Sequence, residues 1–209
     1  MNKTYYFDRL DKKTKHMKNV GSLDFIANSA EKAKLYFYGD IVSSTWETYF
    51  FEDGKCPQDI AEFLGDLDNY QAIEIHINSG GGSVHGGLAI YNLLRRYEGK
   101  KTTYVDGLAA SIAGVIAMAG DEIIVPETAQ IMLHKPWMDY CGNADDFRRA
   151  AESLDSCQET IIAAYLQRAK PDIGREQIEE MINAETWLTG KKAGDYFDVK
   201  VDTLSLIHI

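Results

Sequence analysis

Residues 104–121 read YVDGLAASIAGVIAMAGD. The β-branched residues before Gly107 predict a strand, and the apolar spacing after Ser111 predicts a helix, so the serine stands where a strand turns into a helix. The first N–H groups of a helix have no partner inside it, and the helix dipole favours negative charge there. This pattern indicates a hydroxyl nucleophile beside free N–H donors. The alternative is a buried, alanine-rich helix that contains a serine.

Length and charge limit the classes of protein that this chain represents. The 209 residues, with 45% hydrophobic content, suffice for one domain with a substantial core. A formal net charge of −10 argues against a nucleic-acid partner. The sequence has neither an apolar run near the ~20 residues of a membrane span nor a signal-peptide core. We therefore expect a cytoplasmic protein that binds neither nucleic acid nor membrane.

The three cysteines, Cys56, Cys141 and Cys157, are odd in number, widely spaced and without a CxxC pair. This pattern predicts free thiols in a reducing cytosol, and neither a disulfide framework nor a zinc site.

The N-terminus differs in charge from the rest of the chain. Residues 1–20 are rich in lysine and arginine and show no sustained apolar period, so we predict a mobile basic tail. Residues 21–209 are then expected to form a single domain.

Strands and helices alternate along the middle of the chain, which implies right-handed crossovers and a mainly parallel sheet, that is, an α/β fold. Catalytic groups of such sheets lie at the carboxyl ends of strands, where the pattern places Gly80–Gly82, Ser111 and His134. The predicted elements are strands at 35–42, 72–78, 102–105, 122–125 and 130–133 and helices at 58–68 and 88–97.

Three consecutive glycines, Gly80–Gly82, separate a predicted strand from a helix. They let the backbone adopt conformations that other residues avoid, or let another backbone approach. A phosphate-binding loop is one interpretation, but the Walker-type lysine and the GxGxxG spacing are both absent. A plain turn and an N–H-rich shelf for an extended substrate are the other two.

A long helix is predicted over residues 143–169. Its apolar stripe contains Phe147, Leu154 and Ile161, and it has more apolar length than a domain of this size readily covers. We therefore expect part of it to pair with another copy of the chain. Two shorter helices at 173–183 and 191–197 and an extended segment at 185–188 follow it.

A serine hydroxyl needs an adjacent base, usually a histidine that an acid orients, before it attacks a carbonyl group. Of the five histidines, His134 ends a predicted strand beside Ser111 and is the preferred base. His85, which follows the glycines, is the competing candidate.

Three motifs carry a resemblance to a known family. The segments GLAASIAG, IMLHKP and INSGGGSVHGGLAIYNLL are similar to the nucleophile, base and glycine-loop motifs of the Clp protease proteolytic subunit family. The similarity covers about residues 34–202. It implies the ClpP/crotonase-like fold, a spiral of ββα units with a long projecting helix.

The resemblance also implies roles for particular residues. It makes Ser111 the nucleophile and His134 the general base, and it makes the N–H groups of Gly81 and Ile112 the oxyanion donors. Gly82 and Ser83 fall where the family pairs with an extended substrate. When Trp187-Leu188-Thr189 is matched to the family's motif, Glu185 falls at the position of the acid, where the family commonly has aspartate. Asp195 and Asp198 are the nearby alternatives.

The function implied is that of a serine endopeptidase that works through an acyl-enzyme and needs neither metal nor organic cofactor. The family further implies a ring-shaped homo-oligomer in which the long helix meets its two-fold mate and buries Phe147, Leu154 or Ile161. An ATPase unfoldase and capsid proteins are the partners to expect besides the polypeptide substrate.

The sequence departs from the housekeeping members of the family. It has Gly80 where they usually have proline, Glu185 in place of aspartate, and no recognisable axial-loop sequence for ATPase docking. These departures resemble the phage- and prophage-encoded branch that processes capsid proteins. Two other functions stay open, a crotonase-type acyl-CoA enzyme and a catalytically silent assembly protein.

Overall fold

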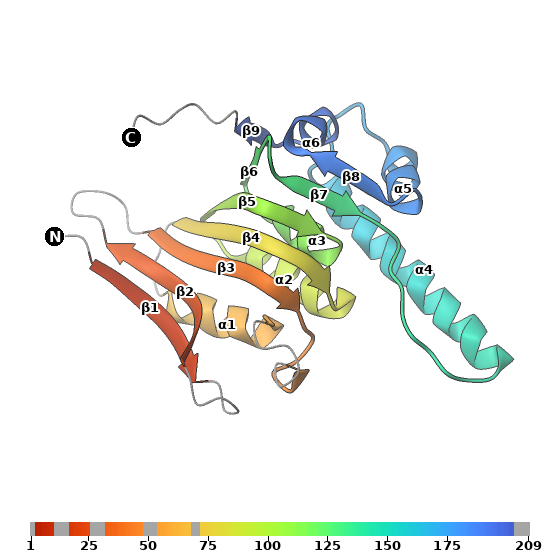
Figure 1. The fold of residues 1–209 in the computed structure, drawn as a ribbon, viewed down its shortest axis with the longest axis horizontal. Helices are drawn as coiled ribbons and strands as arrows, with labels where there is room; N and C mark the ends of the chain where they lie inside the picture. Colours follow the sequence, from red (N-terminus) through yellow and green to blue (C-terminus); the bar gives the residue numbers. More distant parts are fainter. Residues whose placement is uncertain (1–2, 11–16, 26–31, 48–53, 68–71, 203–209) are drawn as a thin grey trace.

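The structure is a computed structural model that describes residues 3–10, 17–25, 32–47, 54–67 and 72–202. Its strands form one nine-stranded sheet, helices α1–α3 lie against one side of the sheet, and α4 extends away from it (Figure 1). The strands are β1 (Lys3–Leu10), β2 (Met17–Phe25), β3 (Lys32–Ile41), β4 (Ala72–Gly82), β5 (Lys100–Ala110), β6 (Glu122–Pro126), β7 (Gln130–Leu133), β8 (Thr186–Thr189) and β9 (Lys200–Asp202). The helices are α1 (Pro57–Asp66), α2 (Val84–Arg96), α3 (Ile112–Ala117), α4 (Ala144–Leu166), α5 (Arg175–Asn183) and α6 (Gly190–Tyr196).

The centre of the sheet is parallel. The strands follow the order β1-β2-β3-β4-β5-β6-β9, and β7 pairs with both β5 and β8. The pairs from β3 to β6, together with β5–β7 and β6–β9, are parallel, whereas β1–β2, β2–β3 and β7–β8 are antiparallel. This confirms the predicted α/β fold. It also brings the carboxyl ends of β4, β5 and β7 to the same edge of the sheet.

One face of the sheet forms the core. Ile73, Ile75 and Ile77 of β4 are each at most 1% exposed, and every residue of α3 is buried. Burying each isoleucine side chain stabilises the fold by about 1.5–3 kcal/mol. Glu74 and His76 lie on the opposite face and are half-buried, as the alternating pattern predicts.

Strands β1 and β2 correct the prediction of a mobile tail over residues 1–20. They form an antiparallel hairpin, and β2 pairs with β3 through Ser22–Asp24. The prediction gave the lysines too much weight, because residues 4–7 read TYYF, a run of strand-forming residues. Pairing with β2 also covers an edge of β3 that would otherwise present unpaired backbone groups.

Strand β4 is longer than the predicted strand 72–78 because it includes the glycines. Its pairing with β5 ends at Ser79↔Ala109, but residues 81–82 continue to pair with residues 40–41 of β3. Of the three interpretations of the glycines, the plain turn is therefore wrong. They are an extension of the sheet beyond the end of β5.

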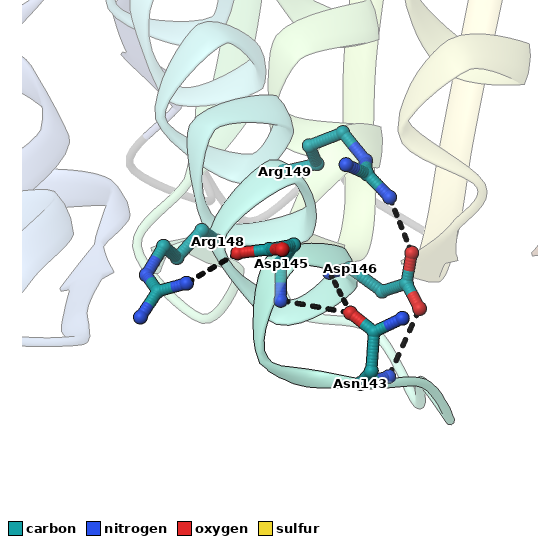
Figure 2. A network of polar contacts seen from close by, with 5 residues as sticks. All are labelled: Asn143, Asp145, Asp146, Arg148 and Arg149. Carbon is teal, nitrogen blue, oxygen red and sulfur yellow. Dashed lines mark hydrogen bonds and ion pairs between the residues drawn. The ribbon is translucent and has the colours of Figure 1, made fainter.

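Helix α4 begins with a closed capping network (Figure 2). The Asn143 side chain accepts hydrogen bonds from the N–H groups of Asp145 (2.9 Å) and Asp146 (3.1 Å), and the Asp146 carboxylate accepts the N–H of Asn143 (2.9 Å). Arg148 and Arg149 form ion pairs with the two aspartates. These bonds satisfy the first N–H groups of the helix, so its start holds together by local contacts.

Packing of α4 against the domain is confined to its last turns. Ile161, Ile162 and Tyr165 are at most 6% exposed, whereas Phe147 in the first turn is 52% exposed. The long helix predicted over residues 143–169 is therefore confirmed. Ile161 is a correction, because it lies in the core of this chain and is not available for the predicted contact with a second copy.

Candidate active site

Ser111 lies at the junction of β5 and α3. Its φ of 55° and ψ of −129° are unusual for a residue with a side chain, and its N–H donates to the carbonyl oxygen of Met132 at 2.9 Å. Such a backbone conformation costs on the order of 1–3 kcal/mol and persists only where its surroundings impose it. The serine is thereby held in a sharp turn at the carboxyl edge of the sheet.

His134 follows β7, which pairs with β5 next to the serine through Ala110↔Met132. A hydrogen bond of 2.7 Å joins His134 Nε2 and Ser111 Oγ. Within the described residues, no other side chain is hydrogen-bonded to Ser111. His85, the competing candidate base, lies exposed in the first turn of α2. The structure therefore brings Ser111 together with His134.

Small residues around Ser111 serve helix packing. A Cβ at Gly87 of α2 would lie 2.2 Å from Ile112 Cγ1, and a Cβ at Gly114 would lie 2.4 Å from the Tyr165 hydroxyl of α4. These two glycines thus let α2 and α4 pack closely against α3.

The glycine loop lies directly beside the serine. A Cβ at Gly81 would meet Ser111 Cβ at 2.7 Å and the Ile112 nitrogen at 3.2 Å. The N–H of Gly81, however, donates to Ser79 Oγ at 3.1 Å. This geometry does not support Gly81 as an oxyanion donor, because its N–H already has an acceptor.

Gly82 presents the next N–H along the loop. The N–H of Ser83 donates to the Ile41 carbonyl of β3 at 2.7 Å, and that of Gly81 is held by Ser79, whose own hydroxyl donates to β3. Between these two engaged N–H groups, that of Gly82 is the candidate oxyanion donor of the glycine loop.

The predicted substrate-binding residues have structural partners. A Cβ at Gly82 would lie 2.1 Å from the Ile41 carbonyl oxygen, so this position packs tightly on β3. Ser83 caps α2, since its hydroxyl accepts the N–H of Gly86 at 3.2 Å. Their role in binding substrate stays a prediction.

Glu185, the predicted acid, immediately precedes β8 on the histidine's side of the site. It precedes Thr186, whose cross-strand partner Leu133 precedes His134. His134 and Glu185 thus lie at the same end of the β7–β8 pair. Glu185 is exposed and has a φ of 49°. In the described part of the chain, no hydrogen bond joins His134 to Glu185 or to the alternatives Asp195 and Asp198.

A second polar cluster, which the sequence analysis did not identify, lies on the open face of the sheet. Asp106 accepts a hydrogen bond from the Tyr38 hydroxyl (2.7 Å) and lies 3.0 Å from His76 Nδ1. Burial alone would raise the pKa of Asp106, but the hydrogen bonds from His76 and Tyr38 outweigh it and lower this pKa. Burial, together with Asp106, raises the pKa of Tyr38 to about 12.

All three cysteines are free, as predicted. Among the described residues, no group of three or more histidine, cysteine, aspartate or glutamate side chains could hold a metal ion. No helix in the same residues has both the length and the apolar character that a membrane crossing requires.

The fold and the site define a class, α/β proteins in which a serine hydroxyl and an imidazole meet at the carboxyl edge of a parallel sheet. Comparison with known families narrows this class. The sequence profile described as Clp protease matches residues 58–197. The chain belongs to the Clp protease family, and its mixed sheet and helices agree with the ClpP/crotonase-like fold.

Several similar proteins come from bacteria. The ATP-dependent Clp protease proteolytic subunit 1 of Chlamydia abortus is 33% identical over 131 residues, which are 60% of this chain and 67% of the relative. The ATP-dependent Clp protease proteolytic subunit of Ligilactobacillus salivarius is 33% identical over 137 residues, covering 64% and 68%. Subunit 1 of Salinibacter ruber is 30% identical over 156 residues, covering 70% and 66%.

Proposed function

We propose that the chain is a serine endopeptidase that cleaves peptide bonds through an acyl-enzyme. The observation that carries this proposal is the 2.7 Å hydrogen bond between Ser111 Oγ and His134 Nε2. Ser111 attacks the peptide carbonyl while His134 accepts its proton, and the imidazolium then protonates the leaving amine. Water, deprotonated by the same histidine, releases the acyl group. No metal or organic cofactor enters these steps.

The oxyanion of each tetrahedral intermediate is assigned to two N–H groups that flank Ser111. Ile112 supplies one, as the resemblance implies. For the second we assign Gly82 in place of Gly81, because the N–H of Gly81 is donated to Ser79. Removal of one such donor costs about 2.7–4 kcal/mol of transition-state stabilisation in another serine peptidase.

Glu185 is proposed to orient the imidazole of His134. Its position at the end of the β7–β8 pair supports this role. Since the bond is not formed in the structure, the carboxylate must turn toward Nδ1 when substrate binds. Catalytic hydrogen bonds of free enzymes often tighten only in the complex.

Substitution of the serine tests the peptidase directly. Ser111→Ala should abolish both cleavage of fluorogenic peptides and labelling by a fluorophosphonate probe, while the thermal unfolding temperature stays within a few degrees. His134→Ala should be equally inactive. His85→Ala is the matched control, because it removes an exposed histidine near the same loop and should retain most of the activity. Turnover by purified Ser111→Ala comparable to the wild type would refute the serine mechanism.

The same assays separate the two other functions. A crotonase-type acyl-CoA enzyme would turn over thioesters and leave peptides intact. A catalytically silent assembly protein would neither cleave peptides nor react with the fluorophosphonate probe. The Ser111–His134 pair favours the peptidase over both.

Assembly is the second part of the proposal. The first turns of α4 are exposed and Phe147 is 52% exposed, which supports a ring-type homo-oligomer in which this half of the helix meets its two-fold mate. A stable contact of this kind buries at least about 1,000 Å² in total. Light scattering should give a mass several times 23.5 kDa. A fully active 23.5 kDa species at micromolar concentration would contradict it.

The physiological partners follow from this assembly. The relatives are named ATP-dependent proteolytic subunits, so an ATPase unfoldase is the first candidate partner. The departures at Gly80 and Glu185 support capsid proteins as the alternative substrate, as in the phage and prophage branch. Cleavage of purified capsid precursor without ATP would support capsid proteins as the substrate. An absolute need for an unfoldase would support the ATPase as the partner.

A further inference from the structure

The hydroxyl of Ser79 joins two strands at the point where the glycine loop begins. It donates to the carbonyl oxygen of Gly39 in β3 at 2.6 Å and accepts the N–H of Gly81 at 3.1 Å. Ser79 is 3% exposed, so water cannot readily replace its two partners. The proposed mechanism gives this side chain no role.

The reason for these two bonds is an irregularity in the sheet. Between the pairs Tyr38↔Asn78 and Asp40↔Gly81, β3 has one residue and β4 has two. Such a bulge interrupts the regular ladder between the strands and leaves backbone groups without their usual partners. The Ser79 hydroxyl bridges this interruption as donor and acceptor at once.

Fixing Gly81 in turn fixes the loop beside Ser111. Gly81 and Gly82 have φ values of 99° and 141°, which only glycine adopts readily, so the chain offers little resistance of its own to rotation here. Gly80 has no atom within 4 Å of the position that a Cβ would take, so it adds no side-chain restraint. The bond from Ser79 therefore restrains the peptide at Gly81 from one side, in addition to the pairing of Gly81 and Gly82 with β3.

We propose that Ser79 is a positioning residue for the oxyanion site, which it orients through Gly81 so that the N–H of Gly82 faces the reacting carbonyl. This inference rests on the proposed peptidase function. It predicts that the Ser79 hydroxyl contributes to turnover more than to substrate binding, since a donor aimed at the oxyanion acts mainly in the transition state.

The test compares Ser79→Ala with Ser79→Thr, which keeps a hydroxyl. Ser79→Ala should lower kcat on a fluorogenic peptide about tenfold and change KM less than about twofold, because loss of an entire donor costs 10²–10³ and this change only misaligns one. The inhibition constant of a peptide boronate, which forms a charged tetrahedral adduct with Ser111, should rise by about the same tenfold. Ser79→Thr should restore kcat to within about threefold.

Two controls separate this role from a structural one. Ser43→Ala removes a hydroxyl near the end of β3 whose bond goes to Glu47, and it should leave kcat and boronate affinity unchanged. Rates are measured well below the unfolding temperature of each variant. Ser79→Cys keeps the volume of the side chain with weak hydrogen bonding and should behave like Ser79→Ala, even where Ser79→Ala is unstable.

The outcomes also separate this inference from the proposed function. A wild-type protein that neither cleaves peptides nor reacts with the fluorophosphonate refutes the peptidase and, with it, the role of Ser79. An active wild type with unchanged kcat and boronate affinity in Ser79→Ala or Ser79→Cys refutes the role of Ser79 alone.

Discussion

Replacing Gly87 with alanine should disturb the active site from a neighbouring helix. A Cβ at this position of α2 would lie 2.2 Å from Ile112 Cγ1, 3.1 Å from its Cγ2 and 3.2 Å from its Cβ. Ordinary contacts begin near 3.4 Å, so Ile112 or α2 must move by about 1.2 Å. Rotation of the isoleucine does not offer an easy escape, since a β-branched side chain in a helix has one strongly preferred χ1 rotamer.

Two opposing terms set the effect on stability. Alanine in a helix interior is favoured over glycine by about 0.5–1 kcal/mol, while overpacking a core costs about 1–3 kcal/mol. The net loss should be about 0.5–2 kcal/mol, or roughly 2–6 °C in unfolding temperature for a chain of this size. Since Ile112 carries a proposed oxyanion donor, kcat should fall by about tenfold to a hundredfold, the scale of a 1 Å misplacement.

Gly65→Ala is the matched control for this substitution. Gly65 lies in the last turn of α1, and a Cβ there would have no atom within 4 Å. It should raise the free energy of unfolding by about 0.4–1 kcal/mol and leave kcat unchanged. Ile112→Ala removes the two γ carbons that lie closest to the new methyl group, so its effect should be non-additive with Gly87→Ala by about 1–2 kcal/mol. A Gly87→Ala variant that is as stable as Gly65→Ala, keeps full kcat and adds linearly to Ile112→Ala would contradict the predicted clash.

Two further predictions concern carboxylates. Glu185→Gln should slow turnover strongly with little change in KM, because an amide favours the wrong imidazole tautomer. A larger loss in Asp195→Asn or Asp198→Asn would transfer the role to that aspartate. Asp106→Asn should lower stability at neutral pH. Because the pKa of Asp106 is lowered in the folded protein, its contribution is present above the ordinary value of 3.8 and is lost as pH falls through the folded value. Urea unfolding at pH 7 and at pH 3 should therefore show a smaller difference from the wild type at the lower pH, and an equal difference at both would contradict the assignment.

The parts of the fold that could be predicted are those in which local pattern and tertiary environment agree. The alternating isoleucines of 72–78 identified both a strand and its buried face, and the spacing of 143–169 identified α4. The N-terminal hairpin was missed because the charge of residues 1–20 was weighed above the strand-forming run at 4–7.

The sequence predicted which residues form the site and that they lie at the ends of strands. Ser111 and His134 were both placed at the carboxyl edge of the sheet, where the structure joins them. The direction of individual N–H groups could not be predicted from the sequence. It depends on the bulge between β3 and β4, where the Ser79 hydroxyl is bonded to Gly39. The approach of Tyr165 to Gly114 could not be predicted either, since it joins residues 51 positions apart in the chain.

The backbone conformation of Ser111 has a consequence for how this chain would change under relaxed selection. At φ 55° and ψ −129°, glycine is the residue with the lowest conformational energy, and serine forgoes on the order of 1–3 kcal/mol to stand there. A copy of the gene retained for assembly alone would gain stability by exchanging this serine for glycine. Serine is therefore the residue to expect at this position where selection for catalysis continues, even though it lowers the stability of the fold.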